Sequence, residues 1–208
     1  MFLKHLTVVA LVAFCIFVEP AAAQVNELSG ILGRTFISNQ GIPGAPAYDP
    51  NLHFGNGLTF EISYARRVMS AEILALALEV PLVVDPTEDV HAAQNLVPKQ
   101  YSSCFVTPAA RLNFFPATSV SPWISFGGGF GHFSESSTLE FGGTNPGKTG
   151  TTTGVLQAGL GLDVKLYKNF SLRAEAREFW SGIPQLNVEA GKSRQYNLFA
   201  GGGIVWHF

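Results

Sequence analysis

One pair of side chains in the sequence has the types and the spacing of a nucleophile and its base. His132 and Ser134 are separated by one residue, so on a β-strand both side chains lie on the same face. An imidazole that takes the proton of a serine hydroxyl is the arrangement used in covalent acyl transfer. Glu135 and Glu140 follow, but neither is an obvious partner to orient the histidine. Because a polar strand end that leads into a loop explains the same residues, we expect no enzymatic activity.

Acidic and imidazole groups also gather between residues 84 and 100, where prolines interrupt the chain. They are Asp85, Glu88, Asp89 and His91. Their spacing matches no established metal-ligand motif, so we expect solvated loop charges and neither a metal nor another cofactor. The Gly127-Gly128-Gly129 run does not indicate a phosphate-binding loop, because no helical pattern follows it.

Most of the remaining charged residues alternate with apolar ones. The stretch from Leu172 to Arg177 reads Leu-Arg-Ala-Glu-Ala-Arg, and residues 153–167 show the same period of two with leucines on one face. This period is typical of a strand that has lipid on one side and a lumen on the other. The pattern therefore predicts an all-β protein whose charged side chains point inward.

The alternation predicts eight strands. They cover residues 26–37, 54–67, 71–83, 101–115, 123–133, 153–167, 170–181 and 194–208. The links alternate between long and short, and the long ones are 38–53, 84–100, 134–152 and 182–193. Short periplasmic turns, long outer loops and an even strand number are properties of outer-membrane barrels. We therefore predict an eight-stranded, antiparallel, up-and-down transmembrane β-barrel.

Several positions are expected to disturb the regular wall. Pro108 lacks a donor for the strand ladder and should mark a bulge. Inward glycines of strand 123–133 leave room for a large side chain opposite or let the wall curve. The Lys168-Asn169 turn needs an extra residue to keep inward and outward faces in register. Gly161→Ser, on the inward face, is expected to be milder than Leu160→Arg on the lipid face.

Inward charge is the main candidate for a functional site. The set predicted to line the lumen is Glu61, Glu79, Arg111, Asp163, Lys165, Arg173, Glu175 and Arg177. Charges within a membrane protein face the interior and pair with one another. The interior of an eight-stranded barrel is only just wide enough for its side chains. We therefore expect a structural plug of paired charges.

Composition agrees with a barrel. Charged residues make up 13% of the chain and hydrophobic residues 47%, whereas soluble domains have roughly 25% charged residues. After the N-terminal segment, no apolar run is long enough for a membrane helix, and in lipid only helices and closed barrels satisfy every backbone group. The net charge of -2 gives no reason to expect a nucleic-acid partner.

The N-terminus has the pattern of an export signal. Lys4 and His5 precede an uncharged apolar run over residues 6–18, and Ala21-Ala22-Ala23 follows. A basic start, a short apolar core and small residues at the end are the parts of a secretory signal peptide. We predict a signal peptide over residues 1–23, cleaved after Ala23, and a barrel domain over residues 24–208.

The C-terminal stretch carries large apolar residues at alternate positions and ends on Phe208. It resembles the closing strand of bacterial outer-membrane barrels, which in those families is also the address read by the assembly machinery. The residues that the resemblance assigns to this signal are Tyr196, Ile204, Trp206 and Phe208.

The whole chain after the signal resembles the small eight-stranded barrels of the OmpA type and the porin-like outer-membrane β-barrel domain. The resemblance implies a Gram-negative outer-membrane protein that contacts lipid and lipopolysaccharide, is inserted by the barrel assembly machinery and is a monomer. We expect no peptidoglycan-binding domain of the kind that many OmpA-type proteins carry. Because this fold supports many functions, the resemblance alone does not decide among them.

The expected function is mainly structural or directed at surface interaction, with a plugged lumen. One alternative is a narrow channel or a carrier of small apolar molecules through a lateral gap near Pro108. A continuous apolar path inside the barrel would favour the carrier, and a closed ring of charges would count against it. Another alternative is hydrolysis, because His132 and Ser134 loosely resemble the active groups of lipid A deacylases, which lie later in those chains.

Overall fold

The structure is a computed structural model that describes residues 25–188 and 193–208. Its elements are all β-strands, and paired strands run antiparallel. Among the described residues, no helix is long and apolar enough to cross a membrane. The signal peptide predicted over residues 1–23 lies outside the described residues and stays a prediction.

Within the described residues, eleven strands form one sheet that closes on itself. They are β1 (Asn26–Ile37), β2 (Gln40–Gly41), β3 (Asn51–Phe54), β4 (Leu58–Ser70), β5 (Leu74–His91), β6 (Gln100–Val106), β7 (Ala109–Phe114), β8 (Val120–Glu135), β9 (Thr151–Tyr167), β10 (Phe170–Ser181) and β11 (Gln195–His207). Closure occurs between β1 and β11, while β1 also pairs with β4. β6 and β7 are two halves of one interrupted strand, and β2 and β3 form a hairpin that adds to the outer part of β5. Counted in this way, the barrel has the eight strands predicted from the sequence.

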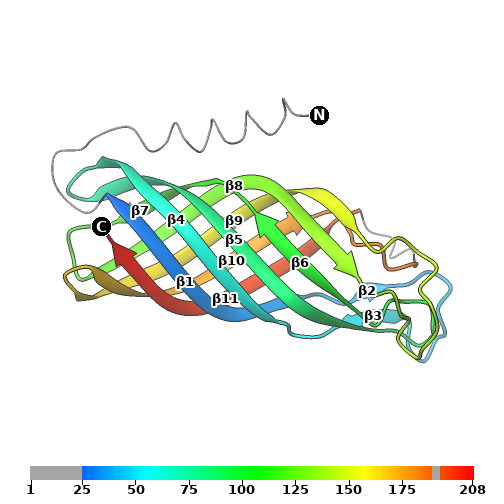
Figure 1. Cartoon of the computed structure of the whole chain (residues 1–208). Coiled ribbons are helices and arrows are strands. Elements are labelled where there is room, and N and C mark those ends of the chain that lie inside the picture. Colours follow the sequence, from blue (N-terminus) through cyan, green and yellow to red (C-terminus); the bar gives the residue numbers. More distant parts are fainter. Residues whose placement is uncertain (1–24, 189–192) are drawn as a thin grey trace, which may run out of the picture.

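The links sort to the two ends as predicted (Figure 1). Short links join β4 to β5, β7 to β8 and β9 to β10 at the end that also holds the C-terminus. The long links and the β2–β3 hairpin lie at the other end. Following the rule for outer-membrane barrels, we call the first the periplasmic end and the second the outer end.

The strand β5 differs most from its predicted bounds, because it continues to His91 instead of ending near residue 83. Buried and exposed residues keep alternating beyond Val84, with one irregularity between Asp85 and Glu88. Both of these carboxyl groups are consequently buried, with exposures of 2% and 0%. The expectation that they are solvated loop charges is therefore wrong for Asp85 and Glu88.

The first long link is also more ordered than predicted. Its proline and glycine residues led us to expect no strand, but β3 adds to the outer part of β5 by pairing His53 with His91 and Phe54 with Val90. The barrel wall therefore extends as a short hairpin at the outer end, beside the long links (Figure 1).

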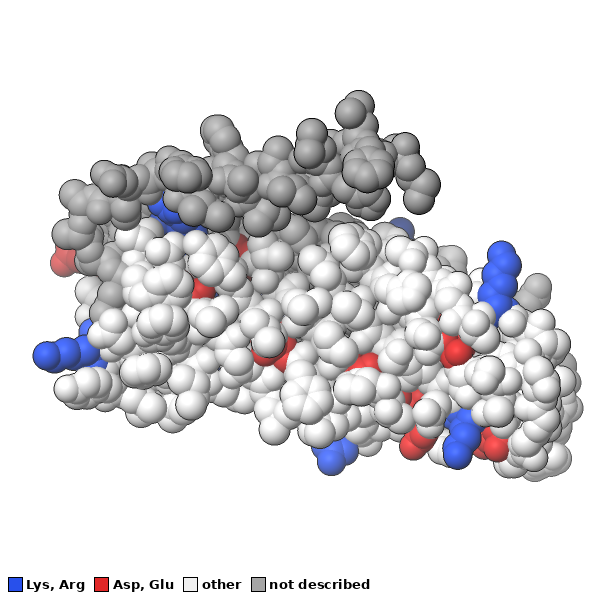
Figure 2. All heavy atoms as spheres, in the orientation of Figure 1, with Lys and Arg blue, Asp and Glu red and all other residues white. Residues whose placement is uncertain are grey.

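The outside of the wall is apolar. Leu160, Ile62 and Ile204 are 61%, 59% and 55% exposed, and they belong to different strands of the ring. Figure 2 shows that most atoms on the visible side of the wall are uncharged. Such a continuous apolar surface on a folded chain marks contact with lipid. The outward parity predicted for Leu160 is thus confirmed.

The strand predicted over residues 101–115 is interrupted at Thr107 and Pro108, where β6 ends and β7 begins. Thr107 N donates to Pro81 O across a long 3.4 Å, and Pro108 O accepts from Gly128 N at 3.1 Å. The predicted irregularity at Pro108 is therefore confirmed, and the wall stays hydrogen-bonded on both sides of it. A Cβ at Gly129 would lie only 3.0 Å from the Cα of Thr107, so this glycine allows close backbone approach.

Two further details of the ladder agree with the sequence. At the β9–β10 turn, Tyr167 pairs with Phe170 but Lys165 pairs with Ser171. The extra residue was predicted for the turn itself, but it is Leu166, at the end of β9. At the seam, Asn26 N donates to Phe208 O at 3.0 Å and Phe208 N donates to Asn26 O at 2.9 Å. The last residue therefore takes part in closing the barrel.

Candidate functional site

Inward-facing residues of six strands place a cluster of ionisable groups in the periplasmic half of the barrel. β10 contributes three of them because Arg173, Glu175 and Arg177 share its inner face. The other members are Glu27 on β1, Glu61 on β4, Glu79 on β5, Arg111 on β7 and Asp163 on β9. None of these eight side chains belongs to a residue more than 7% exposed. We call this set the charge plug.

The outer part of the charge plug is centred on Arg177. Its guanidinium lies 3.0 Å from Glu61, 2.7 Å from Glu79 and 2.8 Å from Glu175. These carboxyl groups come from β4, β5 and β10, so one cation ties together three strands around the ring. Buried charges are tolerated where they are paired in this way.

The periplasmic part of the plug is built on Arg173 and Arg111. Arg173 Nε and Nη2 donate to the two carboxylate oxygens of Asp163, both at 2.7 Å. Glu27 accepts from Arg173 at 3.4 Å and from Arg111. Arg111 also reaches Glu79 at 3.4 Å, which joins the two parts into one network across the lumen.

An indole ring lies at the centre of this network. The guanidinium carbons of Arg111, Arg173 and Arg177 lie 5.6, 5.2 and 5.1 Å from the centroid of Trp123. At such distances the ring face attracts a cation. The Trp123 Nε1 also donates to Asp163 at 3.2 Å. One aromatic side chain therefore separates three like charges and binds one of their partners.

The structure brings together seven of the eight residues predicted for the lumen, and Lys165 is the exception. Lys165 is exposed near the periplasmic end of β9, where its long side chain reaches the rim. Sequence reasoning did not include Glu27 and Trp123. Inward parity on their strands was the signal that would have found both, since Ser29 and Ser125 next to them also face inward.

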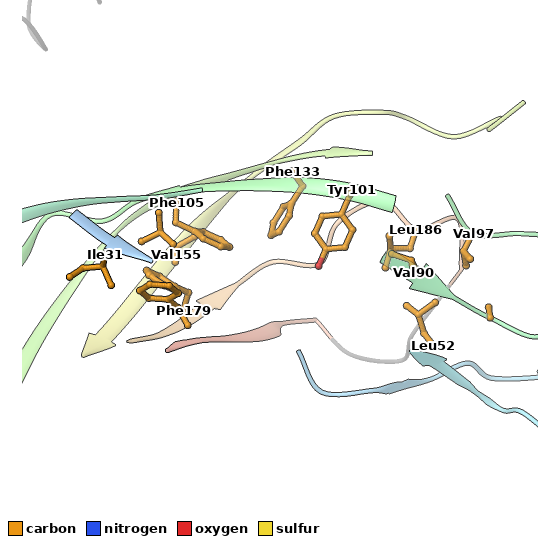
Figure 3. Close-up of a cluster of buried hydrophobic side chains, with 13 residues drawn as sticks. Ile31, Leu52, Val90, Val97, Tyr101, Phe105, Phe133, Val155, Phe179 and Leu186 are labelled. Carbon is orange, nitrogen blue, oxygen red and sulfur yellow. The ribbon is translucent and has the colours of Figure 1, made fainter. Parts of the chain in front are cut away.

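An apolar layer fills the barrel between the charge plug and the outer end (Figure 3). Phe105 and Phe179 stack with ring centroids 4.9 Å apart. Phe133 packs edge-on against Phe105 at 5.7 Å and against Tyr101 at 5.8 Å. The same cluster continues into the outer links through Leu52, Val90, Val97 and Leu186. Gly131 makes room for the Phe105 ring, as predicted for the inward glycines.

The groups considered for acyl transfer do not form a relay. His132 and Ser134 are both exposed on the outer face of β8, and His132 Nδ1 lies 2.9 Å from Thr152 Oγ1. Glu135 faces inward and accepts from Gln185 N at 2.9 Å. Glu140 lies 2.9 Å from the Nδ1 of His91. Both carboxylates are thus bound elsewhere and do not orient His132.

The acidic and imidazole residues between residues 84 and 100, considered above as metal ligands, also lack the geometry of a metal site. Glu88 accepts from Gly57 N at 3.0 Å, and Asp85 lies 3.5 Å from Thr59 Oγ1. Within residues 25–188 and 193–208, no group of three or more His, Cys, Asp or Glu side chains could hold a metal ion. These two acids instead bind the β4 edge of the outer mouth.

The residues predicted as an assembly signal all lie on the outer face of the closing strand. Tyr196, Ile204, Trp206 and Phe208 are between 43% and 55% exposed. The rings of Trp206 and Phe208 stack with centroids 4.5 Å apart. The apolar row expected from the alternation is present, and its role in assembly stays a prediction.

The closed ring, the apolar wall and the sorted links define a small eight-stranded transmembrane β-barrel with the architecture of outer-membrane barrels. No protein-family model matches the chain, and no curated protein matches it significantly. Several solved structures, however, are similar to the chain. Neisserial surface protein A is 14% identical with a TM-score of 0.55, and the match covers 91% of this chain and 100% of that chain.

Two structures from Pseudomonas aeruginosa are similar as well. The outer membrane protein OprG is 11% identical with a TM-score of 0.51, over 89% of this chain and 96% of that chain. The N-terminal β-barrel domain of OprF is 12% identical with a TM-score of 0.50, over 90% and 100%. These similarities establish the fold. The apolar wall agrees with a barrel that spans a membrane.

Proposed function

We propose that this protein is an integral outer-membrane barrel with a mainly structural or surface-interaction role, and that its lumen is closed by its own side chains. The observation that carries the proposal is the charge plug, in which Arg177 alone contacts three carboxyl groups within 3.0 Å. An open path would require several buried pairs to separate at once. Each broken pair leaves an uncompensated charge, at a cost of about 3–5 kcal/mol.

The apolar layer supports the same proposal from the outer side. Phe133, Phe179 and Phe199 are 0–1% exposed inside the wall. Stacked and edge-on aromatic rings pack as densely as other protein cores. An ion that entered from the outer end would therefore meet packed apolar rings before it reached the charges.

The outer links support the surface-interaction part of the role. They bind one another, since Asn187 donates to Asn145 at 2.7 Å and to Leu96 O at 3.1 Å, and Asn95 accepts from Phe141 N at 2.8 Å. The resulting cap exposes apolar side chains to the outside, with Tyr48 at 82% and Phe141 at 65% exposed. An ordered surface of this kind suits recognition better than mobile loops do.

Planar-bilayer recording of the purified barrel tests the plugged lumen. We expect no stable open state in the wild-type protein and brief leaks in Arg177→Met, in which the guanidinium is gone. Lys148→Met, which removes a cation from an exposed outer link, is the matched control and should stay closed. A large, stable conductance in the wild-type barrel would overturn the proposal.

The break at Thr107 and Pro108 favours a second function, transfer of small apolar molecules. It lies between Phe105 of the apolar layer and Arg111 of the charge plug, next to Gly127 and Gly129 of β8. The wall is hydrogen-bonded on both sides of this break, so a lateral exit from the apolar layer into lipid would require the strands to part here. The charges on the periplasmic side of the break count against a path through the barrel. Uptake of a fluorescent apolar dye into proteoliposomes, compared between wild type and Pro108→Ala, tests it. Equal uptake with and without protein would exclude this function.

We propose further that the protein is not an enzyme. The support is that Glu135 and Glu140 are bound away from His132. Incubation with lipopolysaccharide, followed by mass spectrometry of lipid A, is the test. Loss of an acyl chain that depends on Ser134 would contradict the proposal.

The expected partners follow from the exposed wall. We propose a monomer that contacts lipid and lipopolysaccharide and is inserted by the barrel assembly machinery through the row that ends in Trp206 and Phe208. Mass measurement in detergent and assembly of a Phe208-deleted chain in cells test these two statements.

A further inference from the structure

Two opposite charges face outward from the lipid-facing wall. Arg34 on β1 and Glu178 on β10 stand in the outward rows of their strands, and both strands pair with β11. Each charge lies one outward position inside an aromatic residue, Phe36 on β1 and Trp180 on β10. Aromatic girdles mark the interfaces of membrane barrels, so both charges lie within the apolar band.

Neither charge is neutralised within its own barrel. Arg34 Nη1 donates to the backbone oxygen of Asn56 at 3.0 Å, which uses one of the five guanidinium donors and no charge. Among the described residues, the Glu178 carboxylate makes no hydrogen bond or ion pair, and no carboxylate contacts Arg34. Charges within a membrane normally pair with one another, so this face lacks two partners.

The two charges lie at nearly the same height in the wall. The row of residues paired across successive strands starts at Asn26, crosses the whole ring and returns to β1 ten residues further on, at Phe36. From β10 to β1, which is two strands, a row therefore climbs by about 2.5 residues toward the outer end. Arg34 shares its row with Ala176, and Glu178 is two residues closer to the outer end than Ala176. The climb and the step nearly cancel.

The wall between the two charges is suited to close approach. Arg34 and Glu178 are separated by two strand spacings and by two residues along the strand, which is about 12 Å between Cα atoms. Leu198 and Ala200 of β11 lie between them, and Ala176 lies beside Ala200. Small side chains on a lipid-facing surface let a second membrane protein come near the backbone.

A second copy of the barrel supplies both partners. Two copies inserted in the same direction are related by a two-fold axis along the membrane normal, which keeps every residue at its height. If the axis passes β11, it exchanges the β1 side of one copy with the β10 side of the other. Arg34 of one copy then faces Glu178 of the other, and the same pair forms a second time.

The curvature of the wall fits this arrangement. Two round barrels come closest along one line, which here runs past Ala200 on β11. The gap between the walls widens on both sides of that line, toward β1 and β10. The long side chains of Arg34 and Glu178 stand where the gap is wider, and the short one stands where it is narrowest.

We propose that two copies of this barrel associate side by side in the membrane through β1, β10 and β11, with Arg34 of each copy bound to Glu178 of the other. Each copy folds and is inserted as the monomer proposed above, because its ring is closed without a partner. The association joins finished barrels and does not depend on closure of the lumen.

Disulfide cross-linking in lipid vesicles tests the proposal. In a Cys104→Ser background, Ala200→Cys places one thiol on the contact line, and Ala110→Cys places one on β7, on the opposite side of the ring. Both changes replace an outward alanine of the wall. We expect oxidation to link pairs of Ala200→Cys barrels and to leave Ala110→Cys barrels unlinked.

Charge exchange tests the pairing itself. In the Ala200→Cys barrel, Arg34→Glu and Glu178→Arg should each weaken association about tenfold, because both pairs become pairs of like charges. The double variant, which exchanges the two charges, should restore the cross-link. The heat-modifiable band shows whether each variant is folded.

Equal linking of Ala200→Cys and Ala110→Cys would overturn the proposal, and so would no recovery in a folded charge-exchanged variant. Linking that requires lipopolysaccharide in the vesicles and is unaffected by Glu178→Arg would also overturn it, because Arg34 would then bind a lipid phosphate. Mass measurement in detergent, where no bilayer holds two barrels in one plane, tests the monomer separately.

Discussion

Replacing Arg177 with methionine is the most direct way to test whether the buried charges act as one unit. The guanidinium contacts Glu61 at 3.0 Å, Glu79 at 2.7 Å and Glu175 at 2.8 Å. Methionine keeps a long apolar side chain in the lumen but removes the charge. Three carboxyl groups from β4, β5 and β10 are then left close together with one cation fewer.

The expected loss follows from these contacts. Removing one partner of a buried pair costs about 3–5 kcal/mol because the other charge stays buried without compensation. Arg111 keeps its 3.4 Å contact with Glu79, so that carboxylate retains a partner. We therefore expect Arg177→Met to lose at least about 3 kcal/mol of unfolding free energy. Adding Glu61→Gln and Glu175→Gln should recover most of it, since neutral groups of similar volume can replace a buried pair at little cost.

Urea unfolding in lipid vesicles, followed by tryptophan fluorescence, gives the measurement. Of the three tryptophans in the chain, Trp123 is the one in the plug, and its ring centroid lies 5.1 Å from the guanidinium carbon of Arg177. Lys148→Met is the control, because it removes an exposed charge from an outer link. The reasoning fails if Arg177→Met unfolds at the same urea concentration as the control, or if the triple variant is no more stable than the single one.

Four further variants test other parts of the barrel. Deletion of Phe208 removes two backbone hydrogen bonds at the seam and should reduce the heat-modifiable folded band in membranes; an unchanged band would contradict this. Leu160→Arg should cost about 2–4 kcal/mol in vesicle unfolding. Gly161→Ser should now be costly too, because its Cβ would overlap a buried indole and lie 2.7 Å from a carbonyl oxygen; a neutral effect would show that the interior yields. Phe179→Ala should lose about 3–5 kcal/mol in the same assay, since it removes a ring stacked on Phe105.

The strand order and the facing of most residues could be predicted because lipid imposes a strict period of two. In β10, alanines and a leucine alternate with Arg173, Glu175 and Arg177, and an error of one residue would place these charges in hydrocarbon. The bounds of β1 and β10 were predicted correctly for that reason. For Gly161→Ser, the structure gives a reason to expect a larger loss of stability than the sequence did, because parity predicts which way a side chain points but not which atoms it meets.

The pairing of the charges could not be predicted, because strand tilt and stagger decide which inward residues meet. Glu27 is the clearest example. It is the second residue of β1, yet it contacts Arg111 of β7, which is 84 residues away in the sequence. Only the register of the whole ring brings these two heights together. A strand-by-strand reading therefore finds inward charges but not their partners.

The extension of β5 was missed because Pro86 looked like the end of a strand. In the structure it falls at the irregularity between Asp85 and Glu88, where a missing N–H does not interrupt the ladder further on. The strand resumes at once, and Glu88 faces inward again opposite Tyr101. Prolines end strands only where the ladder needs their N–H.

The interior must supply the information that fixes the register of this barrel. Lipid tails are about as apolar as leucine, so residues such as Leu160 gain little from one position over another along the wall. Trp123, in contrast, needs the space that Gly161 leaves opposite it in the β8–β9 pairing, and the β9–β10 pairing in turn places Asp163 opposite Arg173. A slip of one residue would turn all of these side chains toward lipid. The charge plug therefore stabilises one arrangement of the eight strands against all others, in addition to closing the lumen.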